Sequence, residues 1–287
     1  MNYQIPNNLL STNNAKTIKG NKLGYTTYIM YLAPHKQNSK GVNLCAKASK
    51  GCAKACLFNS GAARFDNVQA GKINKTEYFL HDMHGFMEQL YNEIAKIVSK
   101  HNDVVGSEKL STNGSVLRYK DFAIRLNGTS DFPFENYKYK NKDNKNIFQL
   151  FPTVQFYDYT KIDNRFDKEL PSNYHLTFSR SEDNDAKSIE ILNKGFNVAY
   201  VFGVKDVQDL PQTYNGFKVI NGDETDLRFL DDDNVIVGLK YKFMTGKGTK
   251  GANKDNLENN DFLIDLSEDI VTNSKSGTIK KETLQLA

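Results

Sequence analysis

Three cysteines, Cys45, Cys52 and Cys56, are the only cysteines in this chain of 287 residues, and all fall within twelve positions. Thiolates bind zinc, copper(I) and iron–sulfur clusters, so such a group is typical of a metal site. A structural zinc ion normally has four ligands, whereas a [4Fe–4S] cluster held by three cysteines leaves one iron open to a cofactor or substrate. Three interpretations stay open: an iron–sulfur cluster, a zinc site completed by a histidine such as His35, and buried thiols without metal.

The local sequence indicates how the three sulfurs can meet. If the stretch GCAKAC begins a helix, Cys52 and Cys56 lie one turn apart on the same face, and Cys45 approaches from the preceding loop. Gly51 permits a tight backbone where that helix starts. Most of the positions between the cysteines are alanine or serine, which leaves room for a bulky inorganic group.

The elements that must position this loop have the pattern of an α/β protein. A β-rich apolar segment at 26–34 precedes the cysteines, and apolar residues between 74 and 101 recur at helical spacing. Continuous apolar strands alternating with helices or turns favour a parallel sheet. We therefore expect residues 23–242 to form a complete or partial TIM-like (β/α) barrel, with the cysteine loop 45–56 after its first strand. The later predicted strands lie within residues 121–131, 153–161, 174–182, 197–205, 217–226 and 234–242.

Polar side chains follow nearly every predicted strand. In a parallel barrel the carboxyl ends of the strands form one mouth, where the chemistry takes place. Such segments are either ordinary loop starts or part of a site shared with the cysteines. They are residues 127–131, 157–161, 179–182, 203–206 and 221–226.

Two flanking segments differ in composition from this domain. Residues 1–22 are polar and rich in asparagine, and we expect an N-terminal arm lying over the body. Residues 243–287 begin with a basic segment rich in glycine and asparagine, which is either a lid over an anionic ligand or a linker. Its stretch GKGTKG lacks the spacing of a phosphate-binding P-loop, so nucleotide hydrolysis is not predicted.

The chain has no run approaching the about 18 apolar residues of a membrane span. Its first residues also lack the apolar core of a secretory signal. We therefore expect no membrane partner and a cytoplasmic location, where cysteines stay reduced and can bind metal. The oligomeric state cannot be predicted from these features.

Charge is unevenly distributed. Residues 1–65 carry nine cations and no Asp or Glu, while the remaining 222 residues carry 29 cations and 34 anions. A basic region of this kind attracts anionic partners such as a nucleotide or a nucleic acid. The same cations would also stabilise cysteine thiolates, so both interpretations stay open.

The stretch VNLCAKASKGCAKACLFNSGAARFDNVQAGKINKT resembles the signature of the gene product eighty-eight family, which phages and plasmids carry. The stretch GDETDLRFLDDDNVIVGLKYK is similar to its C-terminal part. This resemblance covers most of the chain and places the protein in a bacterial host cell. It implies no settled activity.

A looser resemblance is to the radical S-adenosylmethionine (SAM) superfamily, carried by a strand, a cysteine loop and the stretches RLNGTSDFPFE and FQLFPTVQFYDYTK. It implies that Cys45, Cys52 and Cys56 hold a [4Fe–4S] cluster whose open iron binds SAM. The spacing C-x₆-C-x₃-C departs from the usual C-x₃-C-x₂-C of that superfamily. The resemblance also implies that Asn127, Thr129, Ser130 and Asp131 hold the amino group of SAM, and that Asp158, Ser179 and Arg180 reach its ribose or carboxylate.

Two functions of different classes follow from these features. The first is an iron–sulfur, SAM-dependent enzyme that modifies a nucleotide or a nucleic acid. The second is a zinc-stabilised phage protein that binds nucleic acid or a host protein without catalysis. The identity of the metal separates the two.

Overall fold

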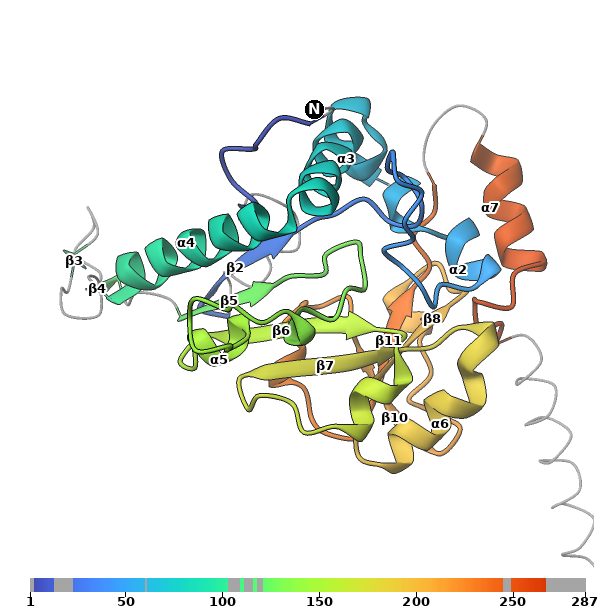
Figure 1. The fold of residues 1–287 in the computed structure, drawn as a ribbon. Coiled ribbons are helices and arrows are strands. Elements are labelled where there is room, and N and C mark those ends of the chain that lie inside the picture. The colour runs from blue at the N-terminus through green and yellow to red at the C-terminus, as the bar shows by residue number, and fades with distance from the viewer. Residues whose placement is uncertain are drawn as a thin grey trace, which may run out of the picture.

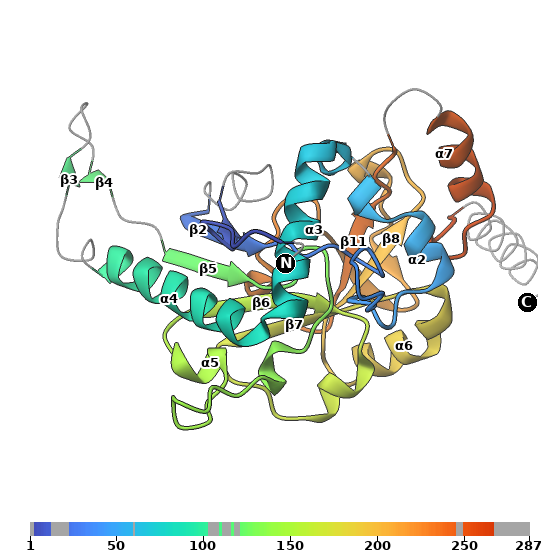
Figure 2. The ribbon, with the colours of Figure 1, turned by 45° about the horizontal axis from the view of Figure 1, so that its top comes forward.

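The computed structural model describes residues 3–12, 23–59, 61–102, 109–110, 116–117, 121–244 and 249–266. Part of the expected N-terminal arm and most of the expected C-terminal tail lie outside these residues. Figures 1 and 2 show one large sheet with helices packed against it.

The sheet has nine strands in the order β1-β2-β5-β6-β7-β8-β11-β10-β9. The seven inner strands are parallel, whereas the two-residue strands β1 and β9 pair antiparallel at the edges. Each of the seven segments predicted as strands overlaps one parallel strand, so the prediction of a mostly parallel sheet is confirmed. The strands are β1 (Leu10–Ser11), β2 (Tyr25–Met30), β5 (Asp121–Arg125), β6 (Gln155–Thr160), β7 (Tyr174–Ser179), β8 (Val198–Phe202), β9 (Thr213–Tyr214), β10 (Phe217–Asn221) and β11 (Ile236–Lys240), with a separate pair β3 (Lys109–Leu110) and β4 (Val116–Leu117).

The sheet is open, so of the predicted complete or partial TIM-like barrel the complete form is wrong, and the partial form is not confirmed. Closure requires the first and last strands of the parallel set to pair with each other. Here β2 pairs at its outer edge with β1, and β10 pairs at its outer edge with β9. The chain also crosses over near its end, because β11 pairs with β8 and leaves β10 outside it.

Helices cover one face of the sheet. The helical stretch predicted at 74–101 is confirmed, but it divides at Asp82, whose side chain accepts a hydrogen bond from Gly85 N at 2.8 Å. Phe79, Leu90 and Ile94 are buried in one core with apolar strand residues. No helix in the described part of the chain is both long and apolar enough to cross a membrane. The helices are α2 (Lys50–Lys54), α3 (Asp66–His81), α4 (Met83–Asn102), α5 (Ile147–Leu150), α6 (Asp185–Asn193) and α7 (Thr249–Glu258), with the short 3₁₀ helices η1 (Leu57–Asn59), η2 (Gly61–Arg64), η3 (Phe134–Asn136), η4 (Asp163–Asp167), η5 (Glu182–Asn184), η6 (Val207–Asp209) and η7 (Arg228–Leu230).

The other face of the sheet carries a mixture of polar, aromatic and apolar side chains, and the segment between β10 and β11 covers part of it. Phe229 of this segment packs against Tyr25 and Tyr157, with ring centroids 5.3 and 5.6 Å apart. Asp226 accepts a hydrogen bond from the Arg125 guanidinium at 2.7 Å, and both side chains are buried. The two faces differ because successive residues of a strand point to opposite sides of the sheet.

Candidate metal centre

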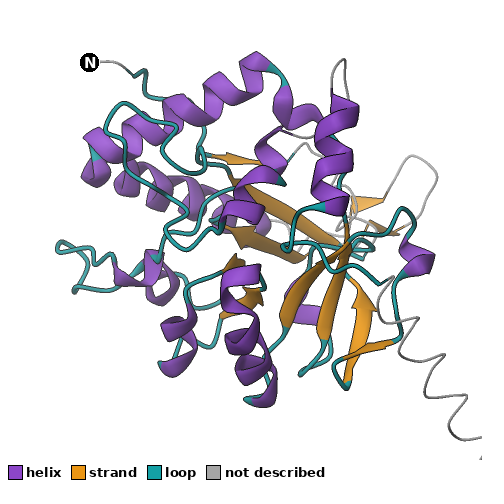
Figure 3. Ribbon diagram, turned by 90° about the vertical axis from the view of Figure 1, so that its right-hand side faces the viewer, coloured by secondary structure: helices purple, strands orange, loops and turns teal. Residues whose placement is uncertain are grey.

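The three cysteines lie in the connection between β2 and α3, which contacts the loops after β5 and β7 at the carboxyl edge of the parallel strands. Figure 1 labels α2 of this connection, and Figure 3 shows helices and loops packed along one side of the strands. Cys52 is in α2, Cys45 is in the loop before it, and Cys56 is two residues beyond its end. The predicted helix is therefore present, but Cys56 lies past it. Ser49 caps α2, and its Oγ accepts a hydrogen bond from Cys52 N at 3.1 Å.

The thiols are close enough to interact electrostatically. Burial raises the pKa of Cys45 to about 12, and the neighbouring Cys56 and Cys52 add to this rise. Burial also raises the pKa of Cys52 and of Cys56, and Cys52 adds to the rise at Cys56. Each thiol therefore keeps its proton at neutral pH unless a positive group stabilises the thiolate. A bound metal would do so, and its binding would release the three protons.

Two lysines lie beside the thiols. Lys161, directly after β6, interacts electrostatically with Cys52, and Lys72 of α3 interacts with Cys56. Burial lowers the pKa of both lysines. Lysine ammonium groups in such positions favour thiolates, the form of cysteine that binds metal.

The lysines are held in place by named contacts. Lys161 Nζ donates to Ser179 Oγ at 2.8 Å and to the carbonyl oxygens of Ser179 and Arg180 at 3.1 and 3.0 Å. Lys72 Nζ lies 5.3 Å from the centre of the Tyr31 ring and 5.1 Å from that of Phe58. The sequence assigned no role to Lys72, because it lies before the stretch 74–101 predicted as helical, whereas α3 begins at Asp66.

The side chains present do not match a site for a single metal ion. Among the residues that the structure describes, no group of three or more His, Cys, Asp or Glu side chains is arranged to hold one. Zinc at about 2.3 Å from each sulfur requires sulfurs about 4 Å apart. His35, the fourth zinc ligand considered above, contacts Cys45 through a backbone hydrogen bond. This arrangement weighs against a closed zinc site.

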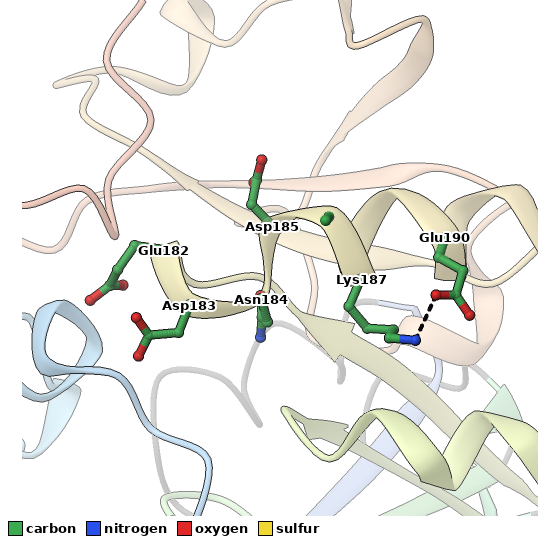
Figure 4. Close-up of a pocket in the computed structure, with 7 residues that line it drawn as sticks. Glu182, Asp183, Asn184, Asp185, Lys187 and Glu190 are labelled. Atoms are coloured by element: carbon green, nitrogen blue, oxygen red, sulfur yellow. Dashed lines mark hydrogen bonds and ion pairs between the residues drawn. The ribbon is translucent and has the colours of Figure 1, made fainter.

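Glu182, after β7, fixes the start of the cysteine helix. Its two carboxylate oxygens accept hydrogen bonds from Ser49 Oγ and from Gly51 N, both at 2.7 Å. Figure 4 shows the Glu182 carboxylate pointing away from α6. Burial opposes ionisation of Glu182, but the hydrogen bonds from Ser49 and Gly51 outweigh it and lower its pKa. Glu182 therefore holds α2 to the carboxyl edge as an anion.

Replacing Glu182 by Gln is expected to lower the free energy of unfolding by about 1–2 kcal/mol, because a charge-assisted hydrogen bond to α2 is lost. Urea unfolding of the purified variant measures this change. Glu190→Gln is the matched control, since Glu190 is exposed and pairs only with surface lysines among its described contacts. We expect that control to change stability by less than about 0.5 kcal/mol. Equal effects from the two variants would contradict the positioning role of Glu182.

The loop after β5, which contains four of the predicted SAM-binding residues, lies directly against the cysteine segment. The Cys45 thiol approaches the Thr129 carbonyl oxygen at 3.6 Å, and Asp131 N donates to Leu44 O at 2.8 Å. Ser130 Oγ donates to Asn127 Oδ1 at 2.9 Å, and Thr129 Oγ1 donates to Leu32 O at 2.5 Å. The structure thus brings these residues and the cysteines to one edge of the sheet.

Asp131 also joins this loop to the neighbouring strands. Its carboxylate accepts from Lys161 N at 2.7 Å and lies 3.4 Å from Arg165 Nη1. Burial raises its pKa, while Lys161 and Arg165 oppose that rise. Asp131 also interacts electrostatically with Cys45 and Cys52, which places its charge beside the thiols.

The other three predicted ligand-binding residues differ in their surroundings. Ser179 and Arg180 lie at the same edge, because both contact Lys161 Nζ. The Arg180 guanidinium donates to Asp185 and to two backbone carbonyls near α7. Asp158 is fully buried in β6, where it accepts from Asn127 N at 2.7 Å and from Tyr174 OH at 2.9 Å. Asp158 therefore fixes the position of Asn127 through the hydrogen bond from the Asn127 backbone. A contact between Asp158 and a ligand stays a prediction.

The burial of Asp158 predicts an unusual dependence of stability on pH. Burial raises its pKa from 3.8 to about 6, against the opposing effect of Arg125. The folded chain therefore binds this proton more tightly than the unfolded chain, and the stability it contributes is present below about pH 4 and lost as the pH rises to about 6. A shift of this size corresponds to about 3 kcal/mol.

Replacing Asp158 by Asn should remove this loss while keeping an oxygen that accepts from Asn127 N. We expect the unfolding free energy of the variant to fall less between pH 4 and 6 than that of the unchanged chain. Urea unfolding across this pH range measures the difference. Asp231, whose pKa burial also raises to about 6, is expected to leave part of the dependence in the variant. Two parallel profiles would contradict the prediction.

The fold and this site together define an α/β protein with a mostly parallel open sheet and three partly buried cysteines in a segment at its carboxyl edge. A model of the family described as Gene product 88 matches residues 8–256, so the chain belongs to the gene product 88 family of phage proteins. The match spans the cysteine segment and every parallel strand, and it confirms the first resemblance seen in the sequence. No curated protein and no solved structure was found to match. The comparisons give no support to the resemblance to the radical SAM superfamily.

Proposed function

We propose that the chain is an iron–sulfur enzyme in which Cys45, Cys52 and Cys56 hold a [4Fe–4S] cluster and SAM binds the fourth iron. The observation that carries this proposal is that the segment with the three cysteines lies against the carboxyl edge of a parallel sheet, where the Cys45 thiol approaches the Thr129 carbonyl oxygen at 3.6 Å. Parallel α/β enzymes place their sites at that edge. A reduced cluster of this kind would supply one-electron chemistry to bound SAM.

The proposed donor set is three cysteine thiolates from one segment of the chain. A cluster takes each thiolate on a different iron, so it accepts a wider set of sulfurs than one tetrahedral ion does. Hydrogen bonds to the sulfurs also tune such clusters. Backbone hydrogen bonds from His35 to Cys45 and from Phe58 to Cys56 are of this type, and both lower the pKa of the thiol they reach.

The chain's own residues would prepare and shield the site. Lys161 and Lys72 stabilise thiolates, and Glu182 fixes the helix that carries Cys52. In this proposal Asn127, Thr129, Ser130 and Asp131 hold the SAM amino group, with Asp131 supplying a carboxylate beside the thiols. The ribose or carboxylate of SAM would be contacted by Ser179 and Arg180, and by Asp158 indirectly, through Asn127.

The proposed substrate is a nucleotide or a nucleic acid. This substrate class is supported by the basic segment of residues 1–65, which carries no Asp or Glu. The lysines of this segment that the structure describes, and Arg64, are exposed and flank the cysteines in the chain. The alternative, a zinc-stabilised phage protein that binds nucleic acid or a host protein without catalysis, rests on the same basic segment. The identity of the bound metal separates the two functions.

SAM binding tests the cofactor half of this proposal. The electron paramagnetic resonance spectrum of the reduced protein should change when SAM is added. Asp131→Asn keeps an oxygen that accepts from Lys161 N but removes the charge, so SAM affinity should fall roughly tenfold to a hundredfold. Asp167→Asn is the control and should bind SAM normally, because Asp167 is exposed at the end of η4 and pairs with Lys194. If the protein holds four irons but its electron paramagnetic resonance spectrum does not change when SAM is added, the assignment of SAM as cofactor is contradicted. The cluster would then have another role.

A further inference from the structure

The surface around the cysteines has two properties that are not needed to bind a cluster. It carries exposed cations that outnumber its acidic residues, of which Asp66 is exposed next to Phe65, and it exposes apolar side chains. Of the eight large hydrophobic residues that are exposed in the described part of the chain, four fall between residues 42 and 68. We call this the cysteine-flanking surface. Its members are Lys36, Lys47, Lys50, Arg64, Val42, Leu57, Phe65 and Val68.

The cations of this surface are available to a partner. Lys36, Lys47, Lys50 and Arg64 form no ion pair with any described residue, unlike Lys54, which lies 3.0 Å from Asp255. Lys47 and Lys50 stand between Cys45 and Cys52 in the chain. An anionic chain bound by them would therefore pass beside the thiols.

Phe65 is the aromatic member of this surface and the most exposed of its apolar residues. It precedes α3, and the residue is 53% exposed. The Arg64 guanidinium carbon lies 5.5 Å from the centre of the Phe65 ring. Leu57 is 45% exposed in η1, whereas its neighbour Phe58 is buried. An exposed aromatic ring next to an unpaired arginine is the arrangement on which single-stranded nucleic acids stack their bases while the cation meets the phosphates.

We propose that the cysteine-flanking surface binds single-stranded nucleic acid, with a base stacked on Phe65 and phosphates on Arg64, Lys47 and Lys50. This inference rests on the proposed function, in which the bound strand is the substrate that must reach the cysteine centre. The single strand is favoured over a duplex because bases inside a duplex cannot stack on a protein ring. The apolar members favour it over a purely electrostatic ligand such as free phosphate.

The test measures binding of a fluorescent 16-nucleotide oligothymidylate to the full chain by anisotropy at several salt concentrations. The strand should bind more tightly than a duplex of the same length. Phe65→Ala should weaken binding roughly tenfold at every salt concentration, since stacking on one aromatic residue has about that effect. Lys47→Gln should reduce the slope of log affinity against log salt by about 0.7.

Two exposed residues elsewhere provide matched controls. Phe196, 39% exposed and packed on Phe166, tests the loss of any surface phenylalanine. Lys218, which pairs with Asp232, tests the loss of any surface lysine. Phe196→Ala and Lys218→Gln should bind the strand as the unchanged chain does.

Equal binding of strand and duplex, or unchanged binding by Phe65→Ala, would overturn the inference. Metal content measured on the same samples keeps it distinct from the proposed function. Protein that holds four irons but does not bind the strand would contradict only the proposed nucleic-acid-binding surface. Protein that binds the strand but holds no iron would contradict only the proposed cluster.

Discussion

Replacing Cys45, Cys52 or Cys56 by serine is expected to reduce bound iron from about four atoms per chain to less than one. Serine is nearly isosteric with cysteine, so the local packing is kept. Its hydroxyl is much harder to deprotonate than a thiol, and it is a poor ligand for the soft cluster irons. At Cys45 the serine also keeps a donor toward the Thr129 carbonyl, which the thiol now approaches at 3.6 Å.

Iron and acid-labile sulfide measured on anaerobically purified variants check this expectation. Urea unfolding of each variant in parallel separates the loss of a ligand from the loss of the fold. If Cys45→Ser retained full iron while Cys52→Ser and Cys56→Ser lost it, the three-ligand centre would be wrong. Two cysteines would then share the metal with other groups.

The second large effect is expected at Gly51, which has no room for a side chain. A Cβ atom there would lie 2.2 Å from Asn260 Oδ1, 2.7 Å from Glu182 Oε1 and 2.8 Å from Phe262 Cβ. Gly51→Ala therefore forces α2 away from the two segments that hold it, at a cost of about 1–3 kcal/mol in unfolding free energy. Because Cys52 is the next residue, the iron content should fall as well.

Gly71 supplies the control for this prediction. It lies within α3, where a Cβ atom would meet nothing within 4 Å. Gly71→Ala should raise the free energy of unfolding by about 0.5–1 kcal/mol, because alanine favours a helix. Urea unfolding and iron analysis of both variants make the comparison. A Gly51→Ala protein as stable and as rich in iron as Gly71→Ala would contradict the close packing around α2.

The seven parallel strands could be predicted because each is a short apolar run that ends in polar residues. The open edges could not, because closure depends on which strands pair at long range. The antiparallel strands β1 and β9 are two residues long and leave no periodic pattern. The exchange of β10 and β11 in the sheet order likewise depends on how the chain crosses over.

The candidate site could be predicted in part for a similar reason. The rule that carboxyl ends of parallel strands meet at one edge placed residues 127–131, Lys161 and Ser179 with the cysteines, and the structure brings them together. The role of Glu182 depends on contacts across 131 and 133 residues of sequence, which no local motif marks.

Gly51 shows the same limit of local reasoning. The sequence suggested a tight backbone, whereas the structure shows that the space a side chain would need is filled by Glu182, Asn260 and Phe262. Asn260 also donates to the Gly51 carbonyl at 3.2 Å across 209 residues of sequence. Such an approach becomes visible only once the C-terminal segment is placed.

The metal content of the full chain, purified without oxygen, tests the central claim most directly. We expect about four irons and four acid-labile sulfides per chain, together with a brown colour. Reconstitution with iron and sulfide under reducing conditions should restore that content if it is lost during purification. Colourless protein that holds one zinc ion, or that takes up no iron on reconstitution, would contradict the account.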